Sequence, residues 1–232
     1  MSPFVFTGNN PIMLVDPNGM EVWLIGNLAE LALSELQKTT SSIVLNRDQE
    51  TGKLSYKQRD GVELDDAAKR IVNAIDDPNA NVNLVATDDS YTSDGSMLMG
   101  GAFMGGVKNS ETGKISTWNF LNPEISSVAD EAGVFGPGST ALHELSEGHE
   151  AAKFMKEQGI NHASPATLGE SNSVFDHAHS KAYPQMTKYF VARMNTNGEK
   201  LSKKEYSQTH TVVLYTRSVL TRENIILKEW KK

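Results

Sequence analysis

The sequence predicts a single α+β domain, in which a small mixed or antiparallel sheet packs on one long helix and on further, shorter helices. Three observations support this fold class. Short strand-like stretches come in pairs around turn residues, as at 48–52 and 109–113. Stretches with helical spacing of apolar residues lie between them. Finally, residues 138–153 are typical of the start of one long helix, and the Pro137-Gly138 pair at its beginning is typical of a turn.

The expected elements can be placed in order along the chain. We expect strands at 22–25, 42–46, 53–58, 82–86, 102–107, 114–121, 209–216 and 223–227. We expect helices at 28–38, with Asn27 as a candidate N-cap, at 63–75, at 174–182 and from Pro184 to Asn195. The stretch 123–135 is expected to be irregular or weakly helical, and the C-terminal Lys/Trp tail to be frayed.

Composition excludes several classes of protein. The chain has 232 residues, 38% of them hydrophobic, which fits a folded globular protein of one domain. Its net charge is −7 and no basic stripe is evident, so we expect no binding to nucleic acid. No apolar run is long enough for a membrane span, and the N-terminus lacks the features of a signal peptide, so we expect a soluble chain that does not export itself. Because cysteine is absent, any metal must be bound by His, Asp or Glu.

The long helix carries a His-Glu-x-x-Glu motif at His143, Glu144 and Glu147. On a helical wheel with Leu142 at 0°, these residues fall near ~100°, ~200° and ~140°. The apolar residues of the helix occupy an arc from ~120° to ~300°, so all three lie within or beside the face expected to be buried. His149 falls near ~340° on this wheel, among the lysines, and is expected to be solvated rather than a metal ligand.

Ionised carboxylates on a buried face are costly unless they are paired or bind a metal. Residues i and i+4 lie above one another on a helix, so His143 and Glu147 can bind one ion together. Glu144 can then reach a water at that ion and take its proton. This is the arrangement of the zincin His-Glu-x-x-His helix, with the second His replaced by Glu147. The alternative is an ordinary helix whose two glutamates pair with lysines from elsewhere in the fold.

Zinc requires a third protein ligand. The remaining histidines that could provide it are His162, His177, His179 and His210. His177 and His179 are two residues apart and cannot face the same way on a helix. We prefer His179, which lies nearer the apolar side of its expected helix. His177, Asp176 and Tyr183 are then candidates for supporting the ligands or polarising a substrate carbonyl.

The N-terminal stretch resembles a known protein family. The sequence Phe4-Val-Phe-Thr-Gly-Asn-Asn-Pro-Ile-Met-Leu-Val-Asp-Pro-Asn-Gly-Met20 is similar to the end of the core domain in Rhs/YD-repeat polymorphic toxins. In that family an Asp-Pro-x-Gly segment closes the repeat shell, and cleavage near it releases a C-terminal toxin domain. The resemblance implies that residues 1–20 are a remnant of the Rhs core. It implies that residues 21–232 are an effector domain, delivered or secreted by a bacterium as part of a larger protein.

A second resemblance concerns the effector domain itself. Ser116-Thr-Trp-Asn-Phe-Leu-Asn-Pro123, followed by Pro137-Gly138 and Leu142-His-Glu-Leu-Ser-Glu147, is similar to zinc metallopeptidase effectors. The opening of the domain, from Val22-Trp-Leu-Ile-Gly26 to Gly52-Lys-Leu-Ser-Tyr56, is also similar to such domains in Rhs toxins. The resemblance implies a compact α+β fold and hydrolysis of peptide bonds.

Together these observations predict a zinc-dependent endopeptidase. We expect one Zn²⁺ per chain on His143, Glu147 and His179, with Glu144 as the general base. The expected partners are a peptide or protein substrate and a cognate immunity protein. The alternative, favoured by Glu147 at a position where zincins carry His, is a catalytically inactive module with a peptidase fold that binds a protein partner.

Overall fold

The computed structural model describes residues 21–89, 91–92, 98–133, 136–166, 172–185, 188–195, 197–202, 211–218 and 220–231. Within these ranges the chain forms five helices and ten strands in mixed sheets, which confirms the α+β class. The helices are α1 Ala29–Lys38, α2 Asp66–Asp76, α3 Pro123–Glu131, α4 Ser139–Gln158 and α5 Ser173–Lys181. No helix of this part of the chain is long and apolar enough to cross a membrane.

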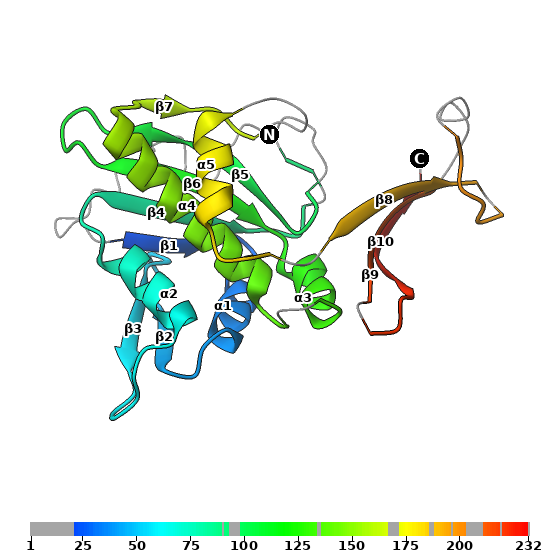
Figure 1. Ribbon diagram of the computed structural model, residues 1–232, viewed down its shortest axis with the longest axis horizontal. Helices are drawn as coiled ribbons and strands as arrows, with labels where there is room; N and C mark the ends of the chain where they lie inside the picture. The colour runs from blue at the N-terminus through cyan, green and yellow to red at the C-terminus, as the bar shows by residue number, and fades with distance from the viewer. Residues whose placement is uncertain are drawn as a thin grey trace.

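The main sheet has five strands in the order β1-β4-β6-β5-β7 (Figure 1). β1 Glu21–Ile25, β4 Ala80–Ala86 and β6 Ile115–Leu121 run parallel, whereas β5 Gly101–Lys108 and β7 His162–Ala163 continue the sheet antiparallel. A separate hairpin, β2 Ile43–Arg47 with β3 Leu54–Gln58, lies beside β1 and α2.

β6 alternates strictly between buried and partly exposed residues, whereas β4 alternates in its first half and ends in three buried residues, Leu84 to Ala86. On β6 the buried positions are Ile115, Thr117, Asn119 and Leu121, and α4 packs on this face. Asn119 is a polar residue at the centre of an otherwise mostly apolar row. Such a residue requires hydrogen-bond partners from whatever covers the sheet.

The long helix α4 begins and ends where the sequence indicates. Gly138 precedes it at φ 83°, and Gly159 ends it at φ 66°, in the left-handed region that favours glycine. The first backbone N–H groups of a helix need acceptors, and Thr140 N–H donates to the Asp130 carboxylate from α3 at 2.9 Å. The same carboxylate accepts from the Ser139 hydroxyl at 2.9 Å.

Two apolar clusters hold α4 in place. Leu142 and Leu145 pack with α1, α2 and the β1–β4 side of the sheet, whereas Ala151 and Met155 pack with Phe103 and with residues of α5. Each fully buried leucine stabilises the fold by about 1.5–3 kcal/mol. The stretch from Leu142 to Ala151, which carries the His-Glu-x-x-Glu motif, is therefore fixed at both ends.

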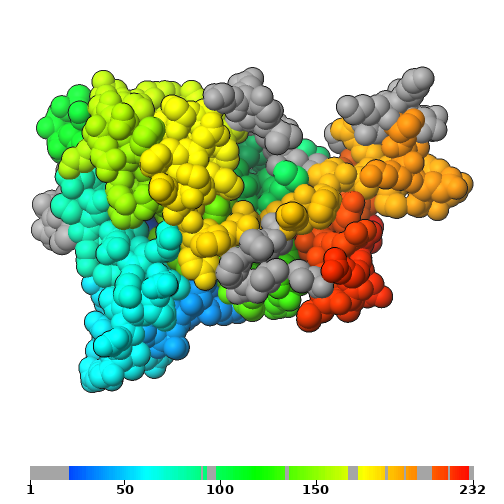
Figure 2. Space-filling model, viewed as in Figure 1, coloured from blue at the N-terminus to red at the C-terminus, as the bar shows by residue number. Residues whose placement is uncertain are grey.

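The C-terminal part of the chain forms a second sheet, in the order β10-β9-β8. Its strands are β8 Tyr189–Met194, β9 Thr211–Arg217 and β10 Asn224–Lys231. This sheet projects from one side of the molecule and meets the rest near α3 (Figures 1 and 2).

Several expectations for individual elements were wrong. The helix expected from Pro184 to Asn195 is largely the strand β8, because Tyr189–Met194 pairs along its whole length with β9. The C-terminal tail is not frayed, since β10 extends to Lys231. Asn27 does not cap α1; its amide donates to Asp88 Oδ1 at 2.7 Å instead. The expected remnant at 1–20 and the candidate ligand His210 lie outside the described residues.

Candidate metal centre

Three side chains from two helices converge beside the central strands. His143 and Glu147 come from α4, one helical turn apart, and His179 comes from the last turn of α5. His143 Nε2 lies 3.1 Å from His179 Nδ1, and His179 Nδ1 lies 2.8 Å from Glu147 Oε1. The third edge, from His143 Nε2 to Glu147 Oε1, is 3.5 Å. Among the described residues, these are the three His, Asp or Glu side chains whose ligand atoms lie close enough together to hold one metal ion.

The size of this triangle suits a small ion. Bonds of ~2.0–2.1 Å to a tetrahedrally coordinated zinc place its ligand atoms roughly 3.3–3.4 Å apart. The observed edges of 2.8, 3.1 and 3.5 Å bracket that spacing. Two imidazole nitrogens and one carboxylate oxygen also match the ligand types of catalytic zinc sites. The residues present therefore fit the metal that the motif implies.

His143 is oriented by a backbone carbonyl. Its Nδ1 lies 2.6 Å from Tyr183 O, and because a carbonyl only accepts hydrogen bonds, Nδ1 carries the proton. Nε2 therefore faces the centre of the triangle. The Tyr183 N–H in turn donates to Ser146 Oγ at 2.7 Å, and the Ser146 hydroxyl donates to the His143 carbonyl at 3.0 Å. Tyr183 thus supports a candidate ligand through its main chain, as outer contacts commonly do at metal sites.

Glu144 lies next to the triangle but is not part of it. Its side chain is almost fully buried, and its Oε2 accepts a hydrogen bond from Asn119 Nδ2 at 3.0 Å. Its other oxygen lies against Gly101 at the start of β5, where the Cβ of any larger residue would collide with it. Glu147 Oε2 accepts from the same Asn119 nitrogen, also at 3.0 Å.

Burial and neighbouring charges set the protonation of these groups. Burial, followed by the negative charge of Glu147, raises the pKa of Glu144 to about 8. Burial lowers the pKa of His143, but its contact with Glu147 and the charges of both glutamates outweigh this and raise the pKa to about 9. Burial raises the pKa of Glu147 too, yet the hydrogen bonds from the two histidines hold it below its usual value. A cation at the triangle would displace the proton on His143 Nε2, leave the proton on Nδ1, and favour the ionised form of Glu144.

The other candidate residues do not reach the triangle. The His177 ring stacks on Phe154, with ring centroids 4.1 Å apart. Asp176 lies in the first turn of α5, three residues before His179, and its backbone N–H donates to Asn172 O. The Tyr183 ring faces Arg70, whose guanidinium carbon lies 5.9 Å from the ring centroid. His162 is exposed on β7.

The expectation that His149 is solvated was wrong. The His149 side chain is buried, and its Nε2 lies 2.9 Å from Asp77 Oδ2, just past the end of α2. The wheel assigned His149 to the wet face because it lies among lysines further along the helix. In the fold, α2 covers this side of α4, so α4 is buried all round from Ser139 to His149.

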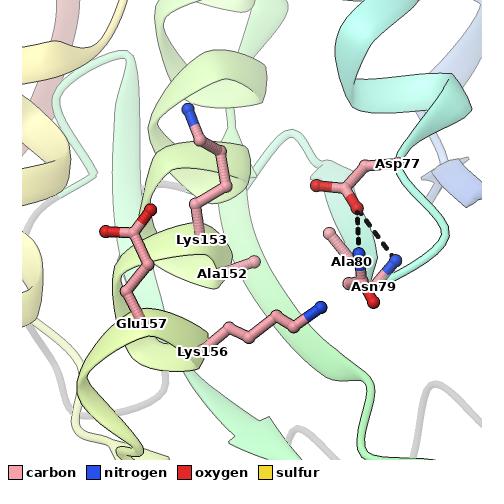
Figure 3. A pocket seen from close by; sticks show the side chains of 7 residues that line it. All are labelled: Asp77, Asn79, Ala80, Ala152, Lys153, Lys156 and Glu157. Carbon is pink, nitrogen blue, oxygen red and sulfur yellow. Dashed lines mark hydrogen bonds between the residues drawn. The ribbon is translucent and has the colours of Figure 1, made fainter.

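A shallow pocket lies elsewhere on α4. It is lined by Ala152, Lys153, Lys156 and Glu157 from the C-terminal half of α4 and by Asp77, Asn79 and Ala80 across from them (Figure 3). None of the triangle residues lines it. Lys153 is paired with Glu150 at 2.9 Å, and Asp77 with Asn79 and His149. We therefore assign the chemistry to the triangle rather than to this pocket.

Asn119 is the residue at the centre that sequence reasoning missed. It lies within the segment that resembles metallopeptidase effectors, but nothing marked it as part of the site. The available signal was its position: it lies on the same face of β6 as Thr117 and Leu121, two residues from each, and therefore faces the motif helix. No protein-family model, curated protein or solved structure matches the chain.

Proposed function

We propose that the chain is a zinc-dependent endopeptidase. The observation that carries this proposal is the convergence of His143 Nε2, Glu147 Oε1 and His179 Nδ1 within 3.5 Å of one another, next to the buried carboxylate of Glu144. Two imidazoles and one carboxylate leave a fourth position of a tetrahedral ion open, as in catalytic rather than structural zinc sites. Zinc bound there would polarise a peptide carbonyl and lower the pKa of water.

The protein's own groups have separate roles in this proposal. Glu144 is the general base: it follows His143 directly in α4, and its Oε1, which Asn119 does not hold, lies against Gly101. Without an ion, burial and Glu147 raise the pKa of Glu144 to about 8; a cation at the triangle would lower this pKa and favour the ionised form that accepts a proton. After taking a proton from water, Glu144 can deliver it to the departing amine. Tyr183 O holds the His143 ring in the tautomer that directs Nε2 to the ion.

Two measurements test this function. Elemental mass spectrometry of protein purified without chelators should find close to one zinc per chain; a chain that takes up no metal even from zinc solution contradicts the proposal. Glu144→Gln should retain that zinc but no longer cleave an unstructured protein such as casein. Since glutamine cannot accept the proton, cleavage at the wild-type rate would remove Glu144 from its role.

A second candidate function is binding of a protein partner by an inactive peptidase fold. The projecting sheet favours it, because Phe190, Val191 and Ile226 are exposed there at 40%, 40% and 56%. The described residues from 188 to 231 also contain seven Lys and Arg against three Glu and no Asp, in a chain whose net charge is −7. This surface suits an acidic partner such as an immunity protein. Bound zinc without cleavage of any substrate, together with complex formation, would favour this function.

The biological setting is a further part of the proposal. We propose that residues 21–232 are the effector of an Rhs-type bacterial toxin and that residues 1–20 are the end of its core. The likeness of the N-terminal segment and the peptidase motif support this setting. Expression of residues 21–232 inside bacterial cells should arrest growth, whereas the Glu144→Gln form should not. Equal growth with both forms would contradict a toxic peptidase.

A further inference from the structure

One buried amide contacts both carboxylates of the centre. Asn119 Nδ2 donates to Glu144 Oε2 and to Glu147 Oε2, each at 3.0 Å. An amide nitrogen carries two hydrogens, so it can serve one carboxylate with each. All three side chains are buried, with exposures of 0%, 4% and 1%, so water does not compete for these bonds.

Because of this contact, one oxygen of each glutamate accepts a hydrogen bond from Asn119 and the other oxygen does not. For Glu147, Oε2 is held by Asn119 and Oε1 alone faces the two histidines. For Glu144, Oε2 is held by Asn119, and Oε1 faces Gly101. The geometry therefore leaves one oxygen of each carboxylate for the ion or for the proton.

The amide itself has little freedom to move. Asn119 lies in β6, between its register partners Leu84 on β4 and Phe103 on β5, so its backbone is fixed on both sides. Its Oδ1 has no hydrogen-bond partner among the described residues and packs against Gly148 of α4, where an added Cβ would lie 2.7 Å away. A flipped amide would turn this oxygen toward two carboxylates, which is unfavourable because all of these atoms are acceptors.

We propose that Asn119 is a positioning residue that restricts Glu147 to one-oxygen coordination and thereby selects zinc over larger divalent ions. Zinc in a three-ligand protein site takes one atom from each ligand, whereas ions such as Mn²⁺ and Ca²⁺ favour more oxygen ligands. A Glu147 freed from Asn119 can turn and offer both oxygens. This inference rests on the proposed zinc site and names the residue that determines its metal preference.

The test compares Asn119→Ala with a matched amide on the same sheet. Asn83 on β4 lies on the opposite face and donates to the Thr117 carbonyl at 3.0 Å, so Asn83→Ala removes a similar hydrogen bond away from the centre. Affinities for Zn²⁺ and Mn²⁺ are measured by chelator competition, and the coordination of bound Co²⁺ by its visible absorption. If the alanine variant fails to fold, Asn119→Leu replaces it in the same measurements, because leucine has a similar size but no hydrogen-bond donor.

The expected result is a loss of about 10–100-fold in zinc affinity for the Asn119 variant, the range typical of outer-shell changes. Affinity for Mn²⁺ should fall less, so the preference for zinc shrinks, and the cobalt bands should weaken as the coordination number rises. Asn83→Ala should match the wild type in all three readouts. An Asn119 variant with unchanged affinities and unchanged cobalt bands overturns this inference alone. A wild-type protein that binds no metal overturns the proposed function as well.

Discussion

The two halves of α4 each contain a buried histidine beside a carboxylate, yet only one half forms a candidate metal centre. In the N-terminal half, His143 Nε2 faces both Glu147 and His179. In the C-terminal half, His149 Nε2 faces only Asp77 among the described residues, at 2.9 Å. The two histidines are similarly buried, with exposures of 3% and 7%.

The number of converging donor atoms therefore separates the two pairs, not their burial. A single histidine and a single carboxylate satisfy each other with one proton, and such a pair links two helices without an ion. Three donor atoms directed at one point leave lone pairs facing each other, which a cation relieves. Matched substitutions in the two halves should expose this difference.

The largest difference between the two halves is expected when the histidine of each half is replaced by alanine. His143→Ala should weaken zinc binding more than about 100-fold, since the loss of a ligand exceeds the ~10–100-fold cost of outer-shell changes. His149→Ala should leave zinc affinity unchanged but lower the free energy of unfolding by about 1–3 kcal/mol, because Asp77 loses a partner. Chelator competition and urea unfolding measure the two quantities. Equal zinc loss in both variants would contradict the distinction between the halves.

The glutamates give the next comparison. Glu147→Gln should lower zinc affinity by about 10-fold or more, because an amide oxygen is a weaker ligand and cannot neutralise the ion. Glu150→Gln breaks only the partly exposed pair with Lys153, and such pairs contribute about 0–1 kcal/mol to stability. Its zinc content should equal that of the wild type. A Glu147→Gln protein that keeps full zinc affinity would exclude this carboxylate as a ligand.

The dependence of zinc affinity on pH should also distinguish the centre. The pKa of His143 is raised to about 9, and the ring must lose its proton at Nε2 to bind an ion. Affinity should therefore fall as the pH drops below about 9, by roughly tenfold per pH unit for one displaced proton. Protonation of Glu144 below about 8 acts in the same direction by removing a nearby negative charge. Calorimetric titrations between pH 6 and 9, chosen around these values, should show this trend. A constant affinity over that range would argue against His143 as a ligand.

The smallest effect is expected at Asp77. Burial raises its pKa, but the hydrogen bonds from Asn79 and His149 outweigh burial and hold the pKa below its usual value. A lowered carboxyl pKa stabilises the fold above the ordinary value of about 3.9, and this stability is lost as the pH falls through the folded value. Asp77→Asn should therefore unfold at a lower temperature than the wild type at pH 7, with a smaller difference at pH 3. Equal differences at both pH values would mean that the charge of Asp77 is not involved.

The sequence was a good guide to local structure. Helical spacing together with Gly138 and Gly159 placed α4, and paired β-branched stretches around turns placed β2–β3 and β5–β6. It failed where long-range pairing decides the conformation. Tyr189–Met194 is a short apolar run compatible with either helix or strand, and it forms a strand because β9 offers a partner.

For the candidate centre, the sequence alone determined that His143, Glu144 and Glu147 lie together on a buried part of one helix, because 3.6-residue periodicity fixes their relative directions. Only the tertiary structure decided the rest. It brought His179 to the same point, turned Asn119 toward both glutamates, and covered His149 with α2. These contacts join residues 25 to 72 positions apart, and no local pattern encodes which of several polar side chains will meet across such separations.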